Sequence, residues 1–169
     1  MIATHDTDVR TPDISECFHE PIEAPTALGE AAVGRLELLE PLVEGLVSLG
    51  LERRIVWHGD VETEDGDRAF GLIWDFDDVP QATVPAGGRG FASYAEAGSA
   101  KLLWTVAVDP SAEDGTFVGG ICLQAWGSDY SAREQLLDVW PVVGPLAEQH
   151  ARRMLATIKS YAEDYAEAA

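Results

Sequence analysis

Residues 131–169 read SAREQLLDVWPVVGPLAEQHARRMLATIKSYAEDYAEAA, and this closing stretch decides the fold. From Leu146 onward its apolar positions recur at spacings of four, four, four, three and four residues, which places them on one helical face. Those positions are Leu146, His150, Met154, Ile158, Tyr161 and Tyr165. Ser131 and Glu134 have the spacing of a capping box, which predicts the start of the helix. Pro141 and Pro145 predict a kink or a restart within it.

The beginning of the chain predicts one strand followed by two short helices. Residues 14–24 alternate imperfectly, which is typical of an edge strand, and Pro21 also suits an edge because proline cannot donate to a ladder. Over residues 25–49 leucines and alanines recur at helical spacing, and Pro41 restarts the pattern before Gly50. The acidic residues of this stretch lie mostly off the apolar stripe and indicate a solvated face.

The middle of the chain predicts a run of antiparallel strands. Residues 51–62 and 68–77 flank the turn pair Asp65-Gly66 and indicate a hairpin. Ile55, Trp57, Gly59 and Val61 are predicted to share the interior face of the first arm, and Phe70, Leu72, Trp74 and Phe76 that of the second. Residues 91–96, 101–109 and 116–126 are further strand predictions, with a short one near position 83. Gly119-Gly120 predicts a bulge or a tight bend.

This order predicts an α+β fold, in which a curved antiparallel sheet of six or seven strands wraps around a long C-terminal helix. We expect residues 1–12 to be a flexible tail and residues 13–169 to form a single domain, because the length suits one core. The N-terminal residues lack the apolar centre of a signal peptide, so we expect a cytoplasmic protein.

The charge of the chain limits the kinds of partner that it is expected to bind. Thirty acidic against 11 basic residues give a net charge of −19, which repels phosphate backbones and anionic lipid surfaces. We therefore expect no nucleic-acid and no membrane partner, and a monomer or a homodimer. Cys17 and Cys122 are expected to be free buried thiols; a disulfide is the alternative if the first and last strands pair.

Three segments resemble a known superfamily. They are residues 91–104 (FASYAEAGSAKLLW), residues 140–145 (WPVVGP), and residues 152–155 (RRML) with 162–163 (AE). With the element order over residues 14–163, they are similar to an uncharacterised bacterial subgroup of the START-like or SRPBCC helix-grip superfamily. That group includes lipid-transfer domains, Bet v 1-type proteins and polyketide cyclases. The resemblance implies a pocket between the sheet and the final helix for a small hydrophobic molecule, such as a lipid, an aromatic compound or a polyketide chain.

Candidate ligand-binding residues follow from the apolar faces of the strands and the last helix. They are Trp57, Phe70, Leu72, Trp74, Trp104, Val106, Ile121, Leu123, Met154 and Ile158, with Arg89 in a glycine-rich loop. Aromatic side chains offer large flat contacts to rings, although filling of an ordinary core explains any single tryptophan slightly better.

His150 and Tyr94 are the candidate catalytic residues. His150 is the titratable group on the apolar stripe of the last helix, so it is a candidate acid or base, and a half-buried structural histidine is the alternative. The histidines show no zinc-ligand spacing with the cysteines, and the acidic stretches lack the spacing of a calcium loop, so we expect no metal and no cofactor.

Three functions remain open on the sequence. The first is binding of a small, largely hydrophobic molecule in an internal cavity. The second is a cofactor-free cyclase or aromatase acting on a polyketide-like substrate. The third is a regulator or co-chaperone-like module that binds a protein through the outer face of its sheet.

Overall fold

The computed structural model describes residues 11–36, 44–46, 48, 55–62, 67–76, 97–113 and 115–168. The strands are β1 (Ile14–Ile22), β2 (Ile55–Glu62), β3 (Arg68–Asp75), β4 (Ser99–Pro110) and β5 (Phe117–Gly127). The helices are α2 (Thr26–Val33) and α5 (Tyr130–Glu167). The strands form one antiparallel sheet in the order β1-β5-β4-β3-β2.

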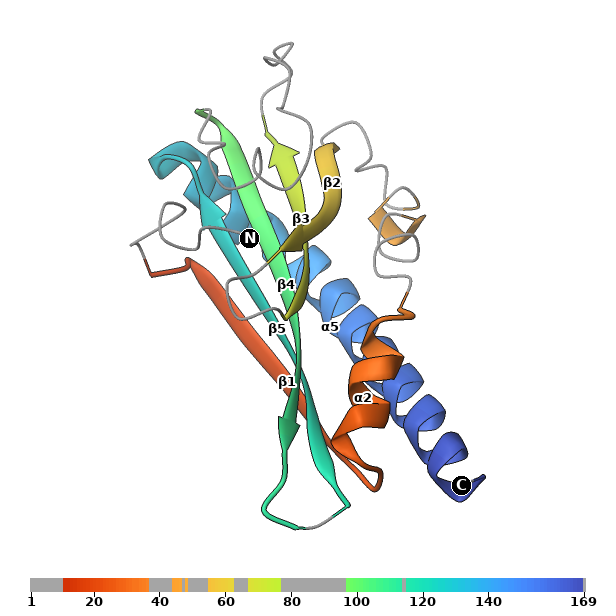
Figure 1. Cartoon of the computed structure of the whole chain (residues 1–169). Helices are drawn as coiled ribbons and strands as arrows, with labels where there is room; N and C mark the ends of the chain where they lie inside the picture. The colour runs from red at the N-terminus through yellow and green to blue at the C-terminus, as the bar shows by residue number, and fades with distance from the viewer. Residues whose placement is uncertain are drawn as a thin grey trace.

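The sheet and the last helix form a helix-grip fold. The first strand pairs with the last one, from Ile14 opposite Ala125 to Ile22 opposite Phe117. The long α5 runs behind the sheet, and α2 lies beside its C-terminal half (Figure 1). The predicted α+β class and the closing helix are confirmed. We call the face of the sheet toward α5 the inner face and the opposite one the outer face.

Alternation along β1 shows that one of its faces packs against the core. Ile14 and Ile22 are buried, whereas Ser15, Cys17, His19 and Pro21 are exposed, so every second residue faces away from the core. The partly buried residues between them contact α5. Trp140 Nε1 donates to Glu16 Oε1 over 3.2 Å, and Lys159 Nζ lies 2.9 Å from Glu20 Oε1. Polar contacts, one of them an ion pair, thus hold the edge strand to the helix.

The start of α5 differs from the capping-box prediction. Asp129, not Ser131, is the N-cap, and its Oδ1 accepts a hydrogen bond of 2.8 Å from the amide of Ala132. Its Oδ2 accepts another from the amide of Gly98 at 2.9 Å. These amide donors, that of Ala132 first, lower the pKa of Asp129 below its usual value because they stabilise the carboxylate. One side chain therefore joins the helix to the turn before β4.

The helix continues through both prolines. Pro141 and Pro145 lie inside α5. Each of them removes one backbone hydrogen bond of the helix, because proline has no amide N–H to donate. Both prolines are exposed, as is Leu137, so the carbonyl groups that they leave without an amide partner lie on the solvent side. Of the predicted kink or restart, the restart is wrong, because α5 is a single helix of 38 residues.

The core lies between the inner face, α2 and α5. It contains Phe70, Leu72 and Trp74 of β3, Leu102, Trp104 and Val106 of β4, and residues of β5 and α5 such as Leu123, Met154 and Ile158. A smaller apolar cluster lies on the outer face and contains Val61, Ala69, Ile73 and Leu103, with Trp57 and Trp126 packed against it.

Trp57 therefore lies on the opposite face from the one predicted. The pairing of β2 with β3 shifts between Ile55 and Trp57, so Ile55 stays opposite Trp74 while Trp57 moves opposite Ile73. The extra residue sends Trp57 and Val61 to the outer face. The irregularity predicted at Gly119-Gly120 is not a bulge, because both ladders of β5 run through these glycines without a shift.

Cys17 and Cys122 form a disulfide, so the prediction of free thiols is wrong. Both residues point to the outer face, at opposite positions of the β1–β5 ladder, and Cys17 is exposed. The alternative that depended on pairing of the first and last strands is the one observed. The strands predicted near 83 and at 91–96, and most of the second short helix, lie outside the described residues.

Candidate functional site

Paired large side chains line the inner face of β3 and β4. Phe70 lies opposite Trp104, and their rings stack with centroids 5.0 Å apart and planes 2° apart. Leu72 lies opposite Leu102, and Trp74 follows with its ring 5.2 Å from that of Phe76. We call Phe70, Leu72, Trp74, Leu102 and Trp104 the aromatic wall. Its side chains are fully buried and belong to the core.

His150 meets this wall from the helix side. It is 5% exposed, and its ring stands edge-on to Phe70 at 6.3 Å with an angle of 89° between the planes. Ala147, Ala151 and Met154, which are neighbours on the same helical face, are buried too. The predicted position of His150 on the buried stripe is therefore confirmed, and its imidazole is held against the ring that stacks on Trp104.

Two polar atoms of the wall lack a partner. The indole Nε1 atoms of Trp74 and Trp104 are buried and have no hydrogen-bond acceptor within the described part of the chain. A buried donor without an acceptor costs about 1–3 kcal/mol. Most buried polar groups in proteins are paired, so each exception needs a reason.

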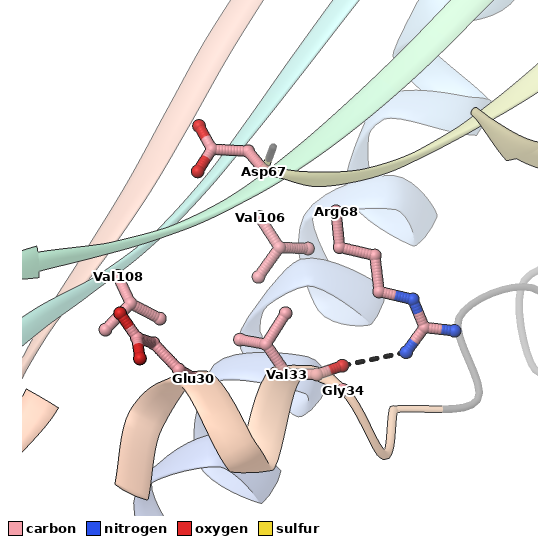
Figure 2. A pocket seen from close by; sticks show the side chains of 7 residues that line it. All are labelled: Glu30, Val33, Gly34, Asp67, Arg68, Val106 and Val108. Atoms are coloured by element: carbon pink, nitrogen blue, oxygen red, sulfur yellow. Dashed lines mark hydrogen bonds between the residues drawn. The ribbon is translucent and has the colours of Figure 1, made fainter. Parts of the chain in front are cut away.

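An open groove lies beside the wall, between α2 and the sheet. Its volume is about 410 Å³. Figure 2 shows the lining residues, which come from three elements that are distant in the sequence. They are Glu30, Val33 and Gly34 from α2 and its end, Asp67 and Arg68 from the start of β3, and Val106 and Val108 from β4. The floor is thus apolar, and the rim carries charges of both signs.

Arg68 is the cation of this groove. Its Nη1 donates to the carbonyl oxygen of Val33 over 2.7 Å, the contact drawn in Figure 2. Its Nη2 lies 3.7 Å from Oδ1 of Asp60, whose side chain is largely exposed. Cations favour the C-terminal end of a helix because its last carbonyl groups lack amide partners. Arg68 therefore both fixes the end of α2 and supplies positive charge to a strongly acidic protein.

The groove and the wall are neighbours on the same face of the sheet. Arg68 lies opposite Val106, and the next inward-facing pair of the ladder is Phe70 opposite Trp104. Two residues along a strand span about 7 Å. A molecule in the groove therefore lies one row away from the stacked pair Phe70–Trp104.

Most of the predicted site residues come together. Phe70, Leu72, Trp74, Trp104, Val106, Ile121, Leu123, Met154 and Ile158 belong to the one core cluster, and His150 lies against it. Trp57 is on the outer face, and Arg89 and Tyr94 lie outside the described residues. Sequence reasoning missed Arg68 and the α2 side of the groove. The sequence does indicate Arg68 in one way: it lies two residues before Phe70 and therefore on the same face of the strand.

Two features are absent from the described residues. No group of three or more His, Cys, Asp or Glu side chains there is arranged to hold a metal ion. None of the helices there is both long and apolar enough to cross a membrane.

Comparison with known proteins finds similarity in solved structures only. No family model and no curated protein matches the sequence. The structure of TTHA0849 from Thermus thermophilus matches with 11% identity and a TM-score of 0.40, over 90% of this chain and 99% of that one. The di-domain ARO/CYC StfQ from the steffimycin biosynthetic pathway matches with 15% identity and a TM-score of 0.31, over 92% of this chain and 53% of that one. The ZhuI aromatase/cyclase from Streptomyces sp. R1128 matches with 12% identity and a TM-score of 0.30, over 89% and 93%.

Proposed function

We propose that the protein binds a small, largely hydrophobic molecule in the groove between α2 and the sheet. The groove of about 410 Å³ carries this proposal, since it opens beside the aromatic wall. Ligand pockets in proteins measure roughly 300–1,000 Å³ and combine an apolar lining with a few polar groups. Val33, Val106 and Val108 provide the apolar contact, and Arg68 provides the charged donor.

The position of α2 suggests how a larger ligand is accommodated. The side chains of the aromatic wall are fully buried, but α2 is a helix of only eight residues, and Arg68 attaches its end to the sheet through one backbone carbonyl. A helix this short depends on tertiary contacts for its stability. Displacement of its end would lengthen the groove toward Phe70 and Trp104.

Binding of fluorene, a rigid tricyclic hydrocarbon, tests the proposal. Fluorene is expected to shift the NMR methyl signals of Val33, Val106 and Val108 and to bind saturably. Val108→Phe would fill the groove and should abolish these shifts. Val142→Phe, the same change at a position of α5 that is 59% exposed, is the matched control and should bind normally. Binding that survives Val108→Phe would refute the groove as the site.

Catalysis by His150 is the second candidate function, because its imidazole is buried against the wall. In a cyclisation of a poly-β-ketone, His150 would remove a proton from a carbon between two carbonyl groups. That carbon would then attack a second carbonyl carbon, and the alkoxide formed would take the proton back from His150. The resulting β-hydroxy ketone would lose one molecule of water, which leaves His150 neutral as at the start. The second catalytic candidate, Tyr94, remains a proposal from the sequence alone.

A synthetic poly-β-ketone provides the assay for this second function. Mass spectrometry should detect the dehydrated cyclic product with the unchanged protein, and His150→Gln should lose turnover while it still binds the substrate. Equal product from both proteins would remove His150 from the reaction.

A further inference from the structure

We infer that the indole N–H groups of Trp104 and Trp74 select ligands that carry neutral acceptor oxygens, such as the carbonyl of an aromatic ketone. The inference rests on the proposed function and adds a chemical requirement to it. An apolar groove alone would accept any hydrocarbon of suitable size. Two directed donors in the adjoining wall distinguish a ketone from a hydrocarbon of the same shape.

The unpaired donors lie together in the aromatic wall. Among the residues that the structure describes, the buried side-chain nitrogen and oxygen atoms without a partner are the Nε1 atoms of Trp74 and Trp104. Both side chains are 1% exposed and both belong to the inner face of adjacent strands. By contrast, the indole of Trp140 donates to Glu16.

The rings beside the two tryptophans are oriented so that they cannot accept the indole N–H groups. The planes of Phe70 and Trp104 are only 2° apart, so the indole N–H of Trp104 runs parallel to the phenyl ring and cannot donate to its face. The Trp74 ring is tilted by 40° to Phe76, which is also far from the perpendicular arrangement in which an N–H points at a ring. The rings of Phe70 and Phe76 therefore do not replace the missing acceptors.

The cross-strand pairs of β3 and β4 follow one another from the groove into the core. Trp104 is in the first row beyond Arg68 and Val106, and Trp74 is two rows deeper, about 14 Å farther along the strands. An extended molecule that enters from the groove therefore reaches Trp104 before Trp74. The wall carries no charged side chain, which favours neutral carbonyl oxygens over carboxylates at this depth.

Fluorenone and fluorene form the test pair, since they share a ring skeleton and differ by a carbonyl in place of a methylene group. Because only fluorenone offers an acceptor, it is expected to bind about tenfold more tightly, which corresponds to one well-made hydrogen bond. In a ¹⁵N–¹H spectrum, the indole signal of Trp104 should move downfield with fluorenone and not with fluorene. Trp140 supplies the reference signal of a hydrogen-bonded indole.

An isosteric replacement isolates the N–H group. Incorporation of 3-benzothienylalanine at position 104 keeps the bicyclic ring and puts sulfur in place of the N–H. This protein should bind fluorene as before and lose the preference for fluorenone. The same replacement at position 126, on the outer face, is the control and should keep that preference.

The outcomes separate the two proposals. Equal affinity for fluorenone and fluorene, with no movement of the Trp104 signal, would overturn the inference and leave the binding function standing. Indole signals of Trp74 and Trp104 that already match the hydrogen-bonded reference in the free protein would overturn it as well. If neither compound binds, the proposed function fails, and the inference fails with it.

Discussion

Arg68 donates to the carbonyl oxygen of Val33, and this 2.7 Å contact joins the first residue of β3 to the last residue of α2. Residues 35 positions apart in the chain thereby define one side of the candidate groove. The same oxygen accepts a hydrogen bond of 3.2 Å from the amide of Leu36, so Arg68 adds a second and charged donor, and hydrogen bonds from charged donors are among the stronger kinds in proteins.

Removal of the Arg68 side chain should therefore loosen α2. We expect Arg68→Ala to lower the free energy of unfolding by about 1–3 kcal/mol, mostly through the lost bond to Val33, since the ion pair with the exposed Asp60 contributes little. Urea unfolding measures the change. Asp60→Ala is the control for the ion pair and should change stability far less. Equal effects of the two substitutions would contradict this assignment.

The disulfide between Cys17 and Cys122 should stabilise the fold through the long loop that it closes. The two cysteines are 105 positions apart, and cross-links of this kind restrict the unfolded chain. Reduction with dithiothreitol is expected to lower the free energy of unfolding by about 2–5 kcal/mol. The double variant Cys17→Ser/Cys122→Ser should show the lower stability and no response to the reductant. A wild-type protein that is insensitive to reduction would contradict the prediction.

The N-cap at Asp129 makes stability depend on pH in the acid range. Its pKa in the folded protein is lowered, chiefly by the amide of Ala132 and then by that of Gly98. The carboxylate therefore stabilises the fold above its unfolded pKa, near 3.8, and this contribution is lost as the pH falls through the lower folded value. Urea midpoints measured from pH 6 downward should fall less steeply below pH 3.8 in Asp129→Asn than in the wild type. Parallel curves for the two proteins would rule out this role for Asp129.

Periodicity predicts the large elements of this protein well. The apolar stripe of α5, the alternation along β1 and the hairpin of β2 and β3 all come from local spacing, because a helix or a half-buried strand repeats its environment at a fixed period. The pairing of the first strand with the last is a matter of topology, and the sequence left it open. Without that pairing, the sequence favoured free thiols at Cys17 and Cys122, which is wrong.

The wrong predictions for Trp57 and for the helix cap each come from a change at one residue. One extra residue between Ile55 and Trp57 transfers Trp57 to the outer face, and no spacing rule locates such a bulge. Asp129 replaces Ser131 as the cap because its carboxylate reaches both Ala132 and Gly98, and Gly98 is near only in the folded chain. Arg68 was missed for the same reason, since its partner Val33 is distant in the sequence.

Two glycines of the α2 region provide a test of how closely this helix approaches the sheet. A Cβ added at Gly29 would lie 2.6 Å from Cζ of Phe117 and 2.9 Å from Cγ1 of Val108, whereas one added at Gly34 would meet nothing closer than 3.6 Å. Gly34 has φ −61° and ψ −18°, which alanine adopts without strain. Alanine at Gly34 is thus expected to stabilise the protein by up to about 1 kcal/mol, because it favours the helical backbone.

Gly29→Ala should act in the opposite direction. Overpacking against the buried ring of Phe117 costs about 1–3 kcal/mol, which exceeds the gain in helix propensity of about 1 kcal/mol. The helix would have to move away from β4 and β5, and because Glu30 and Val33 line the groove, fluorene binding should change with it. Urea unfolding and fluorene titration of the two variants measure both effects. If Gly29→Ala stabilises the protein as much as Gly34→Ala does, α2 does not lie as close to Phe117 as described, and the groove that it borders would have a different shape.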